Sequence, residues 1–497
     1  MAVDVLDPVR AFLDREHQLL IGGEWLPPAG GKSMEALDPA TGGKLTSIAK
    51  AGTPDVDRAV AAARQAFEGH DWRDMPSMAR SELLWTIGAL IDEHRDELAQ
   101  IETLDNGKPL RESRNVDVPS AARYFKYWSG WPTKIFGQTM PMTFPGHWHA
   151  YTLREPVGVV AAIVPWNFPL LMAAWKLAPA LACGCTIILK PASQTSLTAL
   201  RLGELIGQAG VPAGVVNILT GSGSEVGVAL SEHAGVDKVS FTGSTEVGKE
   251  ILQASLGNLK RVSLELGGKS PNIIFADADI DAATKSAAFN GIFFNQGQVC
   301  AAGSRIFVER PVYEQAVDKL AGHAAKLKQG PGMEPGVTIG PVVSEQQLKT
   351  VLGYIEVGRN QDGARLVAGG ERDDALGAGY FVKPTVFADV RNDMTIAQEE
   401  IFGPVATVIP FSDPEEAIQQ ANLNRYGLAS GIWTSDVKKA HRMAQLLRAG
   451  TVWINTYNMI DATTPWGGFK ESGFGREHGS DALNLYTETK TVVLNLD

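Results

Sequence analysis

The chain has little cysteine and no clustered histidine. Among 497 residues there are three cysteines, Cys183, Cys185 and Cys300, and no Cys-x-x-Cys pair. Three thiols are too few for a disulfide framework and are typical of a reducing compartment. The nine histidines include no His-x-x-x-His pair, so we expect no metal site.

Positive charge and long apolar runs are also scarce. The 45 Lys and Arg are outnumbered by 56 Asp and Glu, for a net charge of -11, which works against binding to nucleic acid or to an anionic membrane. The longest strongly apolar run, 157–166, is interrupted by Gly158 and is well short of the ~20 residues of a membrane span. Residues 1–18 lack the pattern of a secretory signal. We expect a cytoplasmic protein with no nucleic-acid or membrane partner.

The remaining composition is that of an ordinary globular protein. Hydrophobic residues make up 44% and charged residues 20% of a chain that exceeds the size at which one core stops growing, so two or three domains are expected. Residues 53–67 predict an amphipathic helix with Thr53 as its cap and Pro54 at its first position. Residues 79–104 predict a second amphipathic helix.

From about residue 157 short apolar runs alternate with helical stretches. The expected strands lie within 157–166, 186–191, 215–221, 238–244, 272–277 and 305–309. Continuous apolar strands between helices indicate a parallel sheet covered on both faces, so the fold class is α/β. After about residue 267 a second alternating set of strands and helices predicts another α/β domain.

Two residues could supply nucleophilic and base chemistry. Cys300 ends the segment FFNQGQVC, and an isolated thiol is more often a small buried hydrophobe than a nucleophile. A nucleophilic role requires an electropositive, partly exposed site that favours the thiolate. Glu265 lies at the end of a β-branched run, and Leu266 separates it from Gly267 and Gly268. It could act as a general base for water or be a solvated acid at a strand end.

An amide and two glycine-rich stretches complete the candidates. Asn167, in VPWNFP, could donate to an oxyanion or form a turn. The stretch at 220–227 spaces its glycines as GxGxxxG, and the chain contains neither GxGxxG nor a Walker A motif, which excludes the common phosphate loops. Gly243 and Ser244 follow a strand and precede a helical segment, where main-chain amides and the helix dipole favour a phosphate.

Six motifs taken together resemble the aldehyde dehydrogenase superfamily. They occur in the family's order as VPWNFP, FTGSTEVG, LELGGKSPN, FFNQGQVC, EEIFGPV and PWGGFKESGFGRE. The resemblance extends from IGGEW at 21–25 to the tail at 488–496. It implies an NAD(P)-dependent enzyme that oxidises an aldehyde to a carboxylic acid through a thioester. In this family Cys300 would be the nucleophile, Glu265 the general base, and Asn167 with the Cys300 main-chain N–H the oxyanion hole.

The resemblance also implies a three-part subunit. The cofactor domain, of variant Rossmann type, would comprise residues 1–130 and 151–266, and the α/β catalytic domain residues 267–482. A small β extension for oligomerisation would comprise 131–150 and 483–497. Because the alternating tail would be an exposed edge strand in a lone subunit, we expect a homodimer or homotetramer.

The family's cofactor contacts map onto this chain with one departure. The implied residues are Ile163, Trp166, Lys190, Ser193, Gly223, Gly243, Ser244, Glu400 and Phe402. The family's usual NAD-binding pattern has a glutamate where Ser193 stands. Such a carboxylate repels the 2′-phosphate of NADP, whereas Ser193 and Lys190 could bind it. We therefore expect NAD as the main cofactor with measurable use of NADP.

The side chains that the family places around the substrate tunnel are apolar. They are Phe168, Met172, Trp175, Phe294, Val299, Ile460 and Trp466. None could pair with a substrate carboxylate, and the segment NMIDATTPWGG resembles family members that oxidise phenylacetaldehyde. We expect an apolar, aromatic aldehyde substrate. Betaine aldehyde, bound in an aromatic cage, or a general aliphatic aldehyde is the alternative.

Two other classes of protein share these motifs. A structural relative without activity would not need Cys300, Glu265, Asn167 and Glu400 together. A relative that transfers the thioester to CoA or phosphate would not need Glu265 to activate water. Cys183 and Cys185 have no matching role in the family and are interpreted as packing residues.

Overall fold

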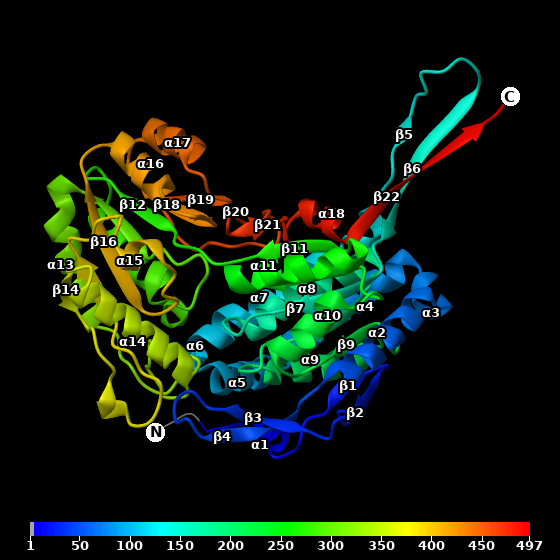
Figure 1. Cartoon of the computed structure of the whole chain (residues 1–497), viewed down its shortest axis with the longest axis horizontal. Coiled ribbons are helices and arrows are strands. Elements are labelled where there is room, and N and C mark those ends of the chain that lie inside the picture. Colours follow the sequence, from blue (N-terminus) through cyan, green and yellow to red (C-terminus); the bar gives the residue numbers. More distant parts are fainter. Residues whose placement is uncertain (1–3) are drawn as a thin grey trace.

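The computed structural model describes residues 4–497. Two mostly parallel sheets form two lobes, and a narrow arm projects from one of them (Figure 1). This arrangement confirms the α/β fold class. No helix within 4–497 is long and apolar enough to cross a membrane.

The first sheet has eight strands and five of them are parallel neighbours. Its order is β2 (Glu24–Leu26), β1 (Leu19–Ile21), β9 (Val216–Ile218), β8 (Thr186–Lys190), β7 (Val159–Ile163), β10 (Lys238–Thr242), β11 (Arg261–Glu265) and β21 (Gly473–Phe474). The outer strands β1, β2 and β21 are antiparallel to their neighbours. The short β21 joins this sheet from the range predicted as the catalytic domain.

Alternate residues of the central strand β7 enter different cores. Val160 and Ala162 pack into the core that contains α8 (Pro169–Cys183) and α9 (Leu197–Gln208). Val159, Ala161 and Ile163 pack into the core with α2 (Thr53–Glu68) on the other face. Helices therefore cover both faces, which explains why the strand is apolar throughout.

The second sheet has seven strands and forms the other lobe. Its order is β14 (Arg365–Ala368), β15 (Thr385–Ala388), β16 (Val405–Phe411), β13 (Arg305–Glu309), β12 (Pro271–Ile274), β18 (Ala429–Trp433) and β19 (Thr451–Ile454). Only the edge strand β14 is antiparallel to its neighbour. The order β16-β13-β12-β18 brings segments distant in sequence side by side.

The remaining strands are short pairs and the arm. The pairs are β3 (Ser33–Leu37) with β4 (Lys44–Ala49), and β17 (Tyr426–Gly427) with β20 (Phe469–Lys470). The arm consists of β22 (Thr487–Asn495), β6 (Trp148–Pro156) and β5 (Thr139–Met140). The other α-helices are α1 (Asp7–Leu13), α3 (His70–Arg73), α4 (Ser77–Glu93), α5 (Arg95–Asn106), α6 (Leu110–Glu112), α7 (Val118–Ser129), α10 (Val228–Glu232), α11 (Thr245–Ala254), α12 (Ile280–Ser286), α13 (Tyr313–Ala325), α14 (Glu345–Asn360), α15 (Thr395–Gln398), α16 (Pro414–Asn422), α17 (Val437–Leu446) and α18 (Leu483–Tyr486).

Two expectations about the N-terminal helices were wrong in detail. Helix α2 is capped by Gly52, so Thr53 and Pro54 are its first two residues. The stretch 79–104 is not one helix, because α4 ends at Glu93 and α5 begins at Arg95. Ile91 and Leu98 are seven residues apart and so keep one helical phase, although the six residues between them are all polar.

The arm includes segments from both ranges predicted for the β extension, and the division into domains stays a prediction. Strand β6 continues to Pro156, past the predicted boundary at 150, because it pairs with β22 along its whole length. Several apolar side chains of the arm are exposed, among them Phe136, Phe144, Val493 and Leu494. An oligomer would bury such side chains, and the oligomeric state stays a prediction.

Candidate active site

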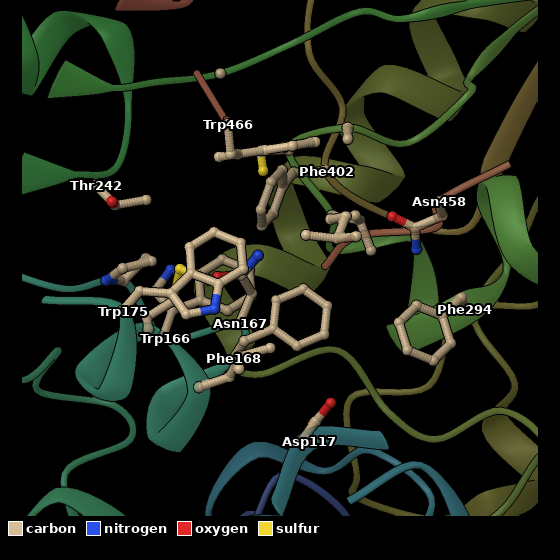
Figure 2. A pocket seen from close by; sticks show the side chains of 18 of the residues that line it. Asp117, Trp166, Asn167, Phe168, Trp175, Thr242, Phe294, Phe402, Asn458 and Trp466 are labelled. Atoms are coloured by element: carbon tan, nitrogen blue, oxygen red, sulfur yellow. The ribbon is translucent and has the colours of Figure 1, made fainter. Parts of the chain in front are cut away.

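A cavity of about 520 Å³ lies between the two lobes and receives side chains from both. Most of the predicted site residues line it, namely Trp166, Asn167, Phe168, Met172, Trp175, Gly243, Ser244, Phe294, Val299, Cys300, Glu400, Phe402, Ile460 and Trp466. Figure 2 shows the aromatic members facing one another around the opening. Ile163, Lys190, Ser193, Gly223 and Glu265 are not part of the lining.

Cys300 follows a strained backbone turn, which its surroundings hold in place. Asn295 and Gln296 have φ angles of 46° and 57°, and Gly297 follows at 72°. Three consecutive residues in the left-handed region are costly, since only glycine adopts it freely. A side chain on Gly297 would lie 2.0 Å from the Gly403 carbonyl oxygen. Such conformations persist where the surroundings fix them, and they cluster at functional sites.

Buried polar groups fix this turn and connect it to Asn167. The Glu112 carboxylate accepts the main-chain N–H of Asn295 at 3.1 Å. The Asn295 side-chain amide and the Lys108 ammonium both donate to the Asn167 carbonyl oxygen, at 2.8 and 2.9 Å. Asn167 in turn donates through Nδ2 to the Gln298 carbonyl oxygen at 2.8 Å. The amide group is thereby oriented beside Cys300, and its second N–H is available to an oxyanion.

The surroundings of the Cys300 thiol are not electropositive, so the free protein does not favour the thiolate. Burial, followed by the carboxylates of Glu265 and Glu400, raises the pKa of Cys300 well above the usual value for a thiol. The residue is still partly exposed, unlike Cys183 and Cys185. In the free protein near neutral pH the group is therefore a protonated thiol, and an acceptor must take its proton before the sulfur can attack.

Glu265 ends strand β11 and lies behind the cavity wall. Its Oε2 accepts a hydrogen bond from the Trp466 indole N–H at 2.8 Å, and Oε1 has no partner within residues 4–497. Burial and then the charge of Glu477 raise the pKa of Glu265 to about 8, against the opposing effect of Lys176. Lys176 forms a buried ion pair with Glu477. A carboxylate that gains a proton near neutral pH suits a general base.

The cofactor side of the cavity contains a helix end and a second carboxylate. Ser244 caps helix α11 by accepting the Val247 N–H, and Gly243 and Ser244 both line the cavity. Glu400 accepts the Gly268 N–H at 3.0 Å, and a side chain on Gly267 would lie 2.2 Å from its Oε2. Burial raises the pKa of Glu400 to about 7. The helix end suits a phosphate and the carboxylate suits a ribose, so these residues fit a dinucleotide.

Phe402 is held in a strained conformation beside this carboxylate. Its φ angle is 56°, and Gln347 donates to its carbonyl oxygen at 2.8 Å. The ring meets Trp166 edge to face, with ring centroids 5.1 Å apart. An aromatic residue with a φ angle in the left-handed region is an outlier, and a functional constraint commonly explains it.

The predicted cofactor residues outside the cavity lie along neighbouring segments of the first sheet. Ile163 and Lys190 are register partners at the ends of β7 and β8. Burial lowers the pKa of Lys190 to about 8, and its ammonium donates to the Pro191 carbonyl oxygen. Ser193 is half-buried two residues further on. Gly223 is exposed, with no heavy atom near the position of a side chain.

The substrate side has an apolar wall and one charged residue that the sequence did not indicate. Phe168 and Phe294 stack with their ring centroids 6.0 Å apart. Asp117 also lines the cavity, and its carboxylate forms a buried ion pair with Lys108. Burial raises the pKa of Asp117. The wall therefore contains no unpaired cation that could receive an anionic substrate.

Other lining residues were missed as well. Among them are Val116, Ser120, Tyr124, Leu171, Thr242, Gln347, Tyr457 and Asn458. Residues 116–124 belong to a helical segment without any chemical motif, so no signal in the sequence marked them. Asn458 and Tyr457 precede Ile460 in the same loop and could have been included by proximity. No three His, Cys, Asp or Glu side chains in the described chain are arranged to hold a metal ion.

Comparison with known proteins identifies the family. The model of the aldehyde dehydrogenase family matches residues 25–492. The phenylacetaldehyde dehydrogenase of Pseudomonas fluorescens is 48% identical and covers 96% of each chain. An NAD⁺ complex of a Bacillus cereus aldehyde dehydrogenase is 50% identical, covers both chains fully and has a TM-score of 0.98. A variant of the P. syringae indole-3-acetaldehyde dehydrogenase, in complex with NAD⁺ and IAA, is 44% identical over 99% of each chain with a TM-score of 0.95. With its motifs, its cavity and these matches, the chain belongs to the aldehyde dehydrogenase family.

Proposed function

We propose that this aldehyde dehydrogenase oxidises an apolar aromatic aldehyde, such as phenylacetaldehyde, to its carboxylic acid with NAD as the oxidant. The observation that carries the proposal is the partly exposed Cys300 at the base of an aromatic-lined cavity. Relatives named for phenylacetaldehyde and indole-3-acetaldehyde support an aromatic substrate, and the NAD⁺ complex of a relative supports the oxidant.

The first chemical step requires a nucleophile and a stabilised oxyanion. After its proton has passed to water, the Cys300 sulfur attacks the aldehyde carbon and forms a hemithioacetal whose oxygen becomes negative. The free N–H of the Asn167 amide and the Cys300 main-chain N–H donate to this oxygen. Bound NAD would accept the hydride from this carbon, and the carbon would then be a thioester.

The second step removes the acyl group from Cys300. Glu265 takes a proton from water as the water oxygen attacks the thioester carbon, and the carbon–sulfur bond breaks to release the acid. Oε1 of Glu265 has no partner in the described chain, so it is the oxygen that can accept this proton. Lys176, paired with Glu477, stabilises the ionised form of Glu265.

Aromatic substrate preference follows from the cavity wall. Phe168, Met172, Trp175 and Val299 are buried side chains with no charge, and each ring contact with an aromatic substrate contributes ~0.5–1.5 kcal/mol. A carboxylate on the substrate would find no cation except Lys108, which is already paired. Betaine aldehyde is the second candidate, because the aromatic rings of the wall could form a cage for its cation.

The substrate proposal predicts a ranking of catalytic efficiency. We expect kcat/KM for phenylacetaldehyde to exceed that for succinate semialdehyde by about 10²-fold or more, since the anion would be desolvated without a partner. Parallel initial-rate kinetics with phenylacetaldehyde, succinate semialdehyde, betaine aldehyde and hexanal provide the measurement. A higher kcat/KM for either charged aldehyde, or for hexanal, would exclude the aromatic assignment.

The cofactor proposal predicts the effect of restoring a carboxylate beside the adenosine ribose. Ser193→Glu is expected to lower kcat/KM for NADP by about 10-fold or more while NAD is spared, because the carboxylate repels the 2′-phosphate. Ser193→Gln is the matched control, since it has the same shape without the charge. An unchanged ratio of NADP to NAD use in Ser193→Glu would show that residue 193 does not face the ribose.

A further inference from the structure

Trp466 lines the cavity and also forms a hydrogen bond with Glu265. Its indole ring lines the cavity on the substrate side (Figure 2). Its N–H donates to Oε2 of Glu265 at 2.8 Å. Both residues are buried, with exposed fractions of 2%. One residue of the substrate wall is thus hydrogen-bonded to the proposed base.

The surrounding side chains fix the orientation of this indole. Trp453 and His478 lie with ring centroids 6.2 and 6.3 Å from Trp466, and Trp175 meets it edge to face at 6.3 Å. The main chain is held as well, because the Trp466 carbonyl oxygen accepts the N–H of Glu477 at 2.8 Å. The indole cannot turn without displacing three other rings, so the N–H remains directed at Glu265.

The hydrogen bond distinguishes the two oxygens of Glu265. Oε2 is occupied by Trp466, whereas Oε1 has no partner in the described part of the chain. A carboxylate with one oxygen held and the other free has a defined direction for accepting a proton from water. Without the indole N–H, either oxygen could face the cavity or rotate out of reach.

We propose that Trp466 is a positioning residue for deacylation, whose indole N–H holds Glu265 so that Oε1 receives the proton of the attacking water. The inference rests on the proposed function, because it requires Glu265 to be the general base. It assigns to Trp466 a contribution to the hydrolytic step in addition to its contact with the substrate.

The charges that face Glu265 determine the sign of the expected pH effect. They are Glu477 and Arg476 of the C-terminal segment, Lys176 of α8, and the Cys300 thiol. Burial and Glu477 raise the pKa of Glu265, while Lys176, the Trp466 hydrogen bond and Arg476 lower it. Removing the Trp466 donor therefore raises the pKa further. The base is then protonated over a wider pH range, and deacylation requires a higher pH.

The test is Trp466→Phe, which keeps an aromatic ring and removes the N–H. A bond to a charged acceptor corresponds to a shift of about 1–2 pH units. We expect the alkaline rise of steady-state turnover to move up by this amount and turnover at pH 7 to fall about 10- to 100-fold. The pre-steady-state burst of NADH, followed at 340 nm, should keep its amplitude and stay within about twofold in rate, since it precedes hydrolysis.

A matched variant separates this effect from simple loss of packing. Trp128→Phe removes a buried indole N–H outside the cavity, and that N–H has no partner in the structure as described. Its pH midpoint is expected to stay where it is in the unsubstituted protein. The burst amplitude counts folded active sites in both variants, so a misfolded variant is recognised directly.

The outcomes distinguish the inference from the function on which it rests. If Trp466→Phe keeps the pH midpoint of the unsubstituted protein while Glu265→Gln stalls after its burst, the positioning role is overturned and the proposed function stands. Equal shifts in Trp466→Phe and Trp128→Phe also overturn the positioning role. If Glu265→Gln turns over at the rate of the unsubstituted protein, Glu265 is not the general base, and both that part of the proposed function and the positioning role fail.

Discussion

Replacement of Cys300 by alanine is expected to abolish aldehyde oxidation, with turnover falling by about 10⁴-fold or more. The sulfur forms the covalent adduct from which the hydride leaves, and no neighbouring side chain can replace it. Cys300 is partly exposed at the cavity, whereas Cys183 and Cys185 are enclosed in the core. NADH formation at 340 nm with saturating phenylacetaldehyde and NAD measures the loss.

Cys183→Ala is the control for this prediction. It removes a thiol of the same chain from a buried packing position, so activity should be retained although stability falls by about 1 kcal/mol or more. Rapid NADH formation by Cys300→Ala, in the pre-steady state or later, would show that oxidation does not proceed through this sulfur.

Glu265→Gln is expected to separate oxidation from hydrolysis. The glutamine keeps the size of the side chain but cannot accept a proton from water, so deacylation should slow by about 10²- to 10⁴-fold. The protein should form up to one equivalent of NADH per active site and then stall with a trapped thioester. Stopped-flow absorbance combined with intact-protein mass spectrometry detects both the burst and the acyl group.

A conservative change outside the cavity provides the comparison. Glu471→Gln changes a carboxylate that pairs with Lys249 and does not line the cavity. This variant should turn over normally. Steady turnover by Glu265→Gln without a stall would assign the base role to another group. The Glu400 carboxylate, whose pKa burial raises to about 7, would then be the next candidate.

The strands of both lobes could be predicted because their apolar residues form uninterrupted runs. Residues 159–163 are buried on both faces, so every position is apolar and the pattern is unmistakable. The order of the strands could not be read in the same way. β21 joins the first sheet through two residues, and so short a segment has no periodicity to detect. The break between α4 and α5 at His94 was missed because Ile91 and Leu98 on its two sides keep the same helical phase.

In the candidate site, too, residues in local motifs could be predicted, whereas a contact between residues far apart in the sequence could not. Cys300, Asn167 and Glu400 occur in motifs, and the fold brings them to one cavity. The bond between Trp466 and Glu265 joins residues 201 positions apart, and no local pattern signals such a contact. The motifs also did not show that the thiol is surrounded by negative charge, which comes from two carboxylates, Glu265 and Glu400.

Because the three thiols are unequally buried, alkylation can be used to count the subunits that have an intact catalytic centre. Burial raises the pKa of Cys183 well above its ordinary value and that of Cys185 to about 11, and neither side chain can be reached without opening the core. A thiol-selective alkylating reagent applied to the native fold therefore meets one partly exposed thiol within residues 4–497, that of Cys300. The stoichiometry of its incorporation equals the fraction of intact catalytic centres in a preparation, independent of which aldehyde is supplied.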